Sequence, residues 1–182
     1  LLDLLWRWQQ GQLACDITCV VSNHNDLRQA VENFGVPFHQ VSVTKDNKTQ
    51  AEADIQALVQ DCDLLVLARY MQILSPEFTE AWHMKIINIH HSFLPAFVGA
   101  DPYRQAYEKG VKLIGATAHY VTADLDQGPI IEQDVHRVSH RHHVTDLRAI
   151  GQDVERSVLT RAVRWHLQNR VIVTGNKTVV FN

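Results

Sequence analysis

The sequence of 182 residues lacks the features that mark membrane and secreted proteins. No apolar run approaches the roughly 18 to 20 residues that a membrane span requires, and no signal peptide is visible. Cysteine is scarce: Cys15, Cys19 and Cys62 are an odd number without the C-x-x-C spacing of metal sites. These observations predict buried thiols in a reducing compartment, and we expect a cytoplasmic protein that does not enter a membrane.

The chain also lacks a surplus of positive charge. It has 17 basic and 20 acidic residues, a formal charge of −3, and no basic run long enough to follow a phosphate backbone. We therefore expect no nucleic-acid partner.

Several catalytic motifs are missing as well. The glycines form neither a phosphate loop nor a dinucleotide-binding fingerprint, and Ser92 lacks the G-x-S-x-G elbow of a serine nucleophile. There are 11 histidines, yet no H-E-x-x-H or paired-cysteine motif accompanies them. We expect no metal site, and interpret the histidine-rich residues 137–143 as a solvated loop.

What the chain does have is an alternating pattern of strands and helices. With 46% hydrophobic and 20% charged residues it can bury one good-sized core. Up to about residue 120 the pattern predicts an α/β fold with an open, doubly wound, mostly parallel sheet and antiparallel C-terminal strands. The predicted strands are 17–22, 38–43, 63–68, 85–90, 113–121 and 129–138, and the predicted helices are 2–8, 26–34, 51–60, 76–82, 103–109 and 147–165, with a final hairpin at 171–181.

Two polar residues end the strand predicted at residues 85–90. Asn88 and His90 are two positions apart, so in an extended strand they point to the face opposite Ile87 and Ile89. Ligands of such sheets bind beyond the carboxyl ends of the strands. An amide and a protonated imidazole can both donate to a developing oxyanion. The alternative is a polar strand end that caps the following turn, and the spacing leaves both open.

A third candidate, Asp126, lies in the turn Leu125-Asp126-Gln127-Gly128-Pro129. Aspartate is common in turns because it bonds its own backbone. Beside an imidazole it would instead position a water molecule and accept its proton, a task that favours a pKa nearer to neutral. Distance along the sequence does not decide between these roles.

The motifs around these residues resemble those of the formyltransferase-fold enzymes that use 10-formyltetrahydrofolate. The resemblance rests on Asn88-Ile89-His90, Ser92, Leu94-Pro95, residues 115–122 and residues 125–131. Within that superfamily the chain looks most like the formyltetrahydrofolate deformylases, in residues 90–97, 99–106, 130–134 and 175–181. Glycinamide ribonucleotide transformylases typically carry Pro where this chain has His91.

The resemblance implies hydrolysis of 10-formyltetrahydrofolate to formate and tetrahydrofolate, in one-carbon and purine metabolism. Asn88 and protonated His90 would bind the carbonyl oxygen, and Asp126 would orient the attacking water. His119 would face the site from a neighbouring strand, although a hydrogen-bonding role in the core is an equal alternative. The folate ring would lie between two walls, made by Met71, Gln72, Ile73 and Leu74 and by Asp124 and Leu125.

Two other functions stay open: formyl transfer to glycinamide ribonucleotide, and folate binding without turnover. No cofactor beyond the folate substrate is expected, and the tryptophan-rich start and the C-terminal hairpin edge favour a homo-oligomer. We expect residues 1–182 to form a single catalytic domain. The resemblance further implies a first strand and an N-terminal ACT-type regulatory domain outside these residues.

Overall fold

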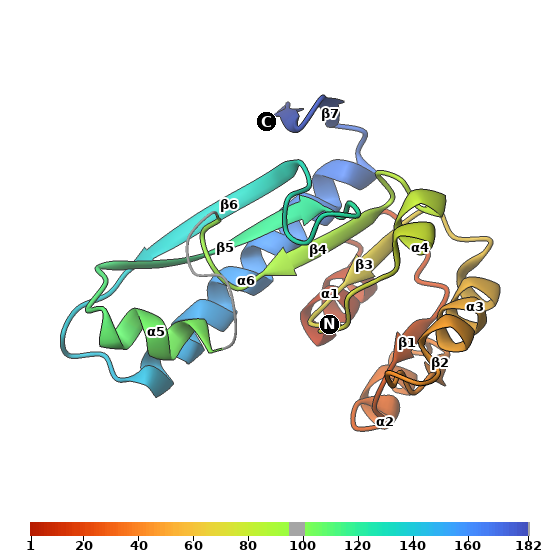
Figure 1. The fold of residues 1–182 in the computed structure, drawn as a ribbon, viewed down its shortest axis with the longest axis horizontal. Helices are drawn as coiled ribbons and strands as arrows, with labels where there is room; N and C mark the ends of the chain where they lie inside the picture. The colour runs from red at the N-terminus through yellow and green to blue at the C-terminus, as the bar shows by residue number, and fades with distance from the viewer. Residues whose placement is uncertain (95–100, 182) are drawn as a thin grey trace.

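A sheet of four strands carries Asn88, His90 and His119 in this computed structural model, which describes residues 1–94 and 101–181. Its strand order is β3 (Leu65–Leu67), β4 (Ile86–His90), β5 (Leu113–Tyr120) and β6 (Ile130–Arg137). β3 and β4 are parallel, whereas β5 is antiparallel to both β4 and β6 (Figure 1). The predicted antiparallel finish is confirmed, and it begins at β5.

The N-terminal part of the chain alternates helices and strands as predicted. It contains α1 (Leu2–Gln9), β1 (Val20–Ser22), α2 (Arg28–Glu32), β2 (Phe38–Gln40) and α3 (Lys48–Val59). β1 and β2 pair in parallel over three residues, as a sheet separate from the four-stranded one. The strand predicted at residues 17–22 is longer than β1, because β1 has a ladder partner over only three residues.

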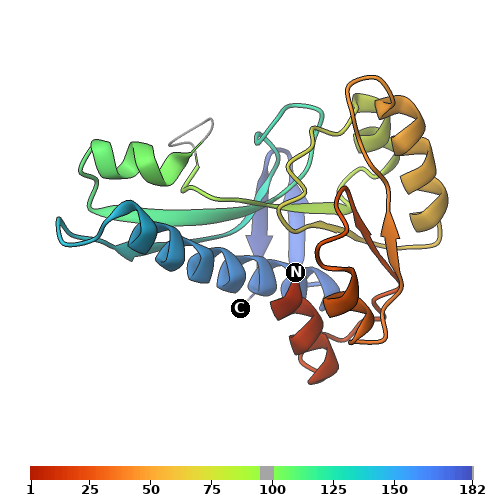
Figure 2. The ribbon, with the colours of Figure 1, turned by 90° about the horizontal axis from the view of Figure 1, so that it is seen from below.

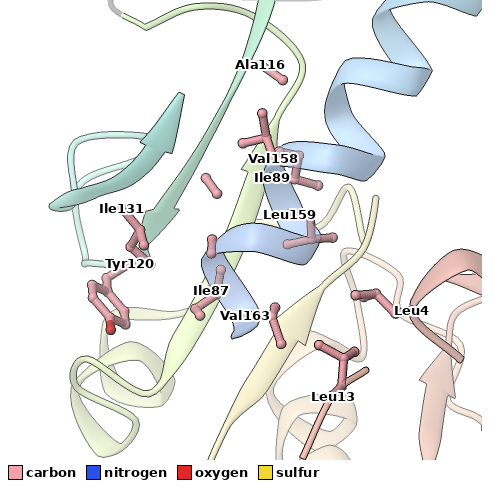
Figure 3. Packing of buried hydrophobic residues seen from close by; sticks show 12 residues of the cluster. Leu4, Leu13, Ile87, Ile89, Ala116, Tyr120, Ile131, Val158, Leu159 and Val163 are labelled. Atoms are coloured by element: carbon pink, nitrogen blue, oxygen red, sulfur yellow. The ribbon is translucent and has the colours of Figure 1, made fainter. Parts of the chain in front are cut away.

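One long helix, α6 (Val144–Leu167), supports the four-stranded sheet. It runs along one face of the sheet (Figure 2), and its apolar side chains meet those of β4 and β5 in the main core (Figure 3). Ile87 and Ile89 of β4 point into this core against Val158 and Leu159. Full burial of such side chains contributes about 1.5 to 3 kcal/mol each. Because strand side chains alternate, burying Ile87 and Ile89 turns Asn88 and His90 to the opposite face.

Two short helices flank the sheet, and both begin with proline. In α4 (Pro76–Ala81) the Ser75 hydroxyl accepts a hydrogen bond from the backbone of Phe78, the capping arrangement that the sequence predicts. α5 (Pro102–Glu108) begins one residue before the predicted helix at Tyr103. Of the motif residues quoted above, Pro95, Ala96, Phe97, Gly99 and Ala100 lie outside the described residues.

The predicted C-terminal hairpin is present as β7 (Val171–Thr174) and β8 (Lys177–Val180), with Gly175 in the left-handed region that such a turn needs. The three cysteines are free and half-buried, so the prediction of buried thiols is wrong in degree. They pack against the hydrophobic cores as partly buried side chains. Among the described residues, no helix is long and apolar enough to cross a membrane.

Candidate functional site

The polar face of β4 meets a buried histidine of β5. Asn88 and His119 are direct partners in the antiparallel register, so their side chains lie on the same face of the sheet. His119 is 2% exposed and His90 is 7% exposed, which places both imidazoles inside the protein rather than at a solvated strand end. The structure therefore brings together three of the residues predicted for one site.

Asp126 reaches these histidines from the turn between β5 and β6. It has a left-handed backbone, with φ of 55°, which lets the turn fold back over the sheet. Two residues later, Gly128 packs so closely on the Tyr120 carbonyl that a Cβ atom at this position would collide with it. The turn is closed by a 2.9 Å hydrogen bond from the Tyr120 amide to the Pro129 carbonyl. Only glycine fits at the contact that holds Asp126 in place.

The carboxylate of Asp126 lies between two imidazoles. Its Oδ2 is 3.2 Å from His90 Nδ1, and its Oδ1 is 3.4 Å from His119 Nε2. The amide nitrogen of Asn88 lies 3.4 Å from the same Nε2. Amide, carboxylate and both imidazoles thus form one contiguous cluster, which we call the polar cluster (Asn88, His90, His119 and Asp126).

The protonation of His119 is partly fixed by the backbone. Its Nδ1 lies 2.8 Å from the Tyr120 carbonyl oxygen, so Nδ1 carries a proton and donates it there. Nε2 then accepts from the Asn88 amide when the ring is neutral, or donates to Asp126 when the ring is charged. Nε2 therefore lies within reach of both the Asn88 amide and the Asp126 carboxylate.

The environment of Asp126 favours its ionised form. The hydrogen bond from His119 is the main cause that lowers the pKa of Asp126, the nearby charges of His90 and His119 add to it, and partial burial opposes them. We expected a pKa nearer to neutral from the sequence, and that expectation is wrong. His119 was expected to face the site, but its contact with this carboxylate was not predicted from the sequence.

The residues predicted to hold folate lie on exposed loops. Met71 and Ile73 follow β3 and are 75% and 64% exposed, and Leu125 in the Asp126 turn is 58% exposed. Exposed apolar side chains also occur elsewhere on the molecule, at Ile172 and Phe181 for example, so exposure by itself does not mark a ligand site. Gln72 and Leu74 are half-buried, and Asp124 is exposed. The polar contacts within the cluster are made by residues of the strands and by Asp126.

An ion pair with one buried partner, not predicted from the sequence, lies beside the site. Glu155 of α6 is 5% exposed and accepts two hydrogen bonds from Arg69, each of 2.8 Å, and one of 2.7 Å from the Tyr103 hydroxyl. Hydrogen bonding to Glu155 raises the pKa of Arg69, and burial together with Glu155 raises the pKa of Tyr103. The available sequence clue was a glutamate within the apolar stripe of a long helix, four residues after Gly151 and three before Val158.

Within residues 1–94 and 101–181, no three His, Cys, Asp or Glu side chains are arranged so that they could hold a metal ion.

Comparison with known proteins gives the class to which this fold and cluster belong. The formyl transferase family matches residues 1–163, and the chain belongs to that family. It is 57% identical to a formyltetrahydrofolate deformylase of Bacillus subtilis (strain 168), an alignment that covers 99% of this chain and 61% of the relative. The chain thus spans less than two thirds of that relative's length.

Solved structures agree with this assignment. A formyltetrahydrofolate deformylase from Pseudomonas syringae pv. tomato matches with a TM-score of 0.96 and 55% identity, over 99% of this chain and 61% of that one. A glycinamide ribonucleotide transformylase from Symbiobacterium toebii matches with a TM-score of 0.91 and 30% identity, over 100% of this chain and 88% of that one. The predicted formyltransferase-type fold is confirmed, and the chain is more similar in sequence to the deformylases than to this transformylase.

Proposed function

We propose that the chain is the catalytic part of a hydrolase that converts 10-formyltetrahydrofolate and water to formate and tetrahydrofolate. The observation that carries the proposal is the carboxylate of Asp126 held between His90 and His119 beside the Asn88 amide. The high identity to proteins named formyltetrahydrofolate deformylase supports the same reaction. The proposal concerns a C–N bond of an amide-like formyl group.

Such a carbon is a weak electrophile, so catalysis needs a positioned water and stabilisation of the oxyanion. In the proposed reaction, water attacks the formyl carbon and its oxygen forms the new C–O bond. Asn88 and protonated His90 donate hydrogen bonds to the former carbonyl oxygen. The C–N bond then breaks, the folate nitrogen takes a proton and formate leaves.

Asp126 has two tasks in this scheme. As an ionised acceptor it holds His90 by Nδ1, which leaves Nε2 as the ring nitrogen that serves the substrate. It also orients the attacking water and passes the water's proton on toward the folate nitrogen. The lowered pKa of Asp126 keeps the carboxylate charged for orientation, so that it holds the proton only in passing.

The proposed folate site uses the two exposed loops. Met71, Ile73 and Leu125 offer apolar surface for the pterin and its linker, while Gln72 and Asp124 offer polar groups near it. A site of this kind, with apolar walls and a few polar groups, is typical of cofactor-sized ligands. Leu74 packs beneath this loop, against the core that contains Phe78.

The test is formate release from 10-formyltetrahydrofolate by the purified protein. Asn88→Ala and Asp126→Ala are each expected to lower turnover about 10²- to 10³-fold, the typical cost of losing one oxyanion donor or an equivalent group. His83→Ala, at an exposed histidine after α4, is the matched control and should leave turnover unchanged. Near-normal formate release in the two site variants would contradict the proposal.

Formyl transfer to glycinamide ribonucleotide is the second candidate, because a transformylase shares the fold at 30% identity. The same assay separates the two, since a transferase needs the ribonucleotide whereas a hydrolase releases formate without it. Folate binding without any turnover would indicate a binding module instead.

We also propose that residues 1–182 act as one catalytic domain in the cytoplasm, with no cofactor beyond the folate substrate, and that the protein forms a homo-oligomer. Size-exclusion chromatography with light scattering tests the oligomeric state.

A further inference from the structure

Two consecutive histidines stack on each other at the end of β4. The ring centroids of His90 and His91 are 5.0 Å apart and the planes are inclined by only 15°. Consecutive side chains of a strand point to opposite faces, so this stack exists only because β4 ends at His90 and the chain bends at His91. The bend lays the second ring over the first.

His91 also lies beside an anchored aromatic ring. The Tyr103 ring centroid lies 6.4 Å from that of His91, at an inclination of 39°. Tyr103 is 6% exposed, and its hydroxyl donates a 2.7 Å hydrogen bond to Glu155, which Arg69 holds by two further bonds. The ring that supports His91 is therefore fixed by charge-assisted hydrogen bonds.

Helix α6 makes room for this support. At Gly151 a Cβ atom would run into the Tyr103 ring and its hydroxyl, so the helix accepts the tyrosine only without a side chain there. Glycine inside a helix costs about 1 kcal/mol relative to alanine. The packing of Tyr103 against His91 thus requires glycine at position 151, although glycine is unfavourable inside a helix.

The His91 ring itself is suited to stacking. Burial is the main cause that lowers the pKa of His91, so the ring is neutral near pH 7 and its face can attract a charged imidazolium. Its Nε2 is buried and has no hydrogen-bond partner among the residues that the structure describes. A phenyl ring at this place would therefore lose no hydrogen bond from Nε2, and the flat ring is the property that the surroundings use.

We propose that His91 is a positioning residue for the hydrolysis proposed above: its ring, propped by Tyr103, holds the ring of His90 so that His90 Nδ1 meets the carboxylate of Asp126. This inference rests on the proposed function for its kinetic consequence. The geometric part, the orientation of His90, stands independently of turnover. His91 acts through His90 and does not itself bind the substrate.

Kinetics of variants in the full-length protein test this role. His91→Ala removes the flat ring and is expected to lower kcat about tenfold while KM stays within about twofold, because a misdirected catalytic group weakens the reaction more than binding. His91→Phe keeps the flat ring and is expected to stay within about threefold of the parent kcat. Should the alanine variant fail to fold, His91→Leu fills the space without a flat ring and takes its place. Tyr107→Phe, at an exposed tyrosine of α5, is the control and should match the parent.

A spectroscopic measurement keeps the two proposals separable. In NMR spectra of the protein with labelled histidine, the Nδ1 proton of His90 reports its hydrogen bond to Asp126. We expect this resonance to stay in His91→Phe and to shift or disappear in His91→Ala. If the parent releases no formate, the proposed function fails and the NMR comparison alone decides the positioning role. The inference is overturned if the alanine and phenylalanine variants lose kcat equally, or if both keep the parent's kcat and resonance.

Discussion

Asp126 Oδ1 lies 3.4 Å from Nε2 of His119, a histidine that is 2% exposed and fixed by its other nitrogen to the Tyr120 carbonyl. His119 therefore does more than fill space in the core, because its hydrogen bond to the Tyr120 carbonyl directs its ring toward the Asp126 carboxylate. This contact also explains why the pKa of Asp126 is lowered in spite of partial burial.

The pH dependence of stability should report this contact. A carboxyl whose folded-state pKa is lowered contributes stability above its unfolded pKa, about 3.9, and loses it as the pH falls through the folded-state value. We expect the free energy of unfolding of the parent to fall more steeply below about pH 4 than that of Asp126→Asn, which has no carboxyl at this site. Urea unfolding followed by circular dichroism between pH 2 and pH 7 measures both curves. Parallel curves would show that the pKa of Asp126 does not change on folding.

A polar substitution at His119 tests what its fixed ring contributes to turnover, apart from filling space. His119→Gln keeps a polar side chain but loses the fixed ring, and we expect kcat to fall about tenfold to a hundredfold, because neither Asp126 nor Asn88 keeps its partner. We also expect the pKa of Asp126 to rise in this variant, since the hydrogen bond from His119 is the main cause of its lowering. Formate release and carboxyl NMR titration test the two effects. His166→Gln, a half-buried histidine bonded to Tyr120, is a matched control whose kcat should stay near the parent value.

A sequence can predict those parts of the site that are determined by residues near one another in the chain. Asn88 and His90 were predictable because the alternation of apolar residues in β4 fixes which face they occupy, and because the strand ends there. The position of Asp126 against His119 depends on the turn closed at Gly128 and on the β5–β6 register, which the sequence states only indirectly. The prediction of a polar site at this sheet edge was therefore possible, but not its carboxylate-centred geometry.

Long-range contacts were out of reach for a more basic reason. Arg69 and Glu155 are 86 residues apart in the sequence, and their meeting depends on how α6 is rotated on the sheet. Helical periodicity gives the apolar stripe but not its exact rotation. In the same way, alternation predicted parallel strands, yet it could not show that β1 and β2 pair separately from the four-stranded sheet.

The ion pair itself should matter for stability. Glu155→Ala leaves the Tyr103 hydroxyl buried without its acceptor and removes the partner of Arg69, whose side chain is 50% exposed and can partly recover its hydration. We therefore expect a loss of about 1 to 3 kcal/mol in the free energy of unfolding, less than for a fully buried pair. Denaturant unfolding measures it. Glu108→Ala, at an exposed glutamate of α5, is the control and should change stability by less than about 0.5 kcal/mol. Equal effects of the two substitutions would contradict a structural role for Glu155.

The exposed apolar loop after β3 gives the sharpest test of where folate binds. Ile73 is 64% exposed, so Ile73→Ser should leave stability almost unchanged, because little apolar area is removed from the core. If this side chain forms a wall for the pterin, KM for 10-formyltetrahydrofolate should rise about three- to tenfold with kcat nearly constant, since a uniform binding contact is lost. The matched control is Ile172→Ser, at a 52% exposed isoleucine of the β7–β8 hairpin. It makes the same change of side chain at a place outside the polar cluster and should leave KM unchanged. A rise in KM for both variants would point to a general effect of lost apolar surface, and no rise for Ile73→Ser would remove this loop from the proposed folate site.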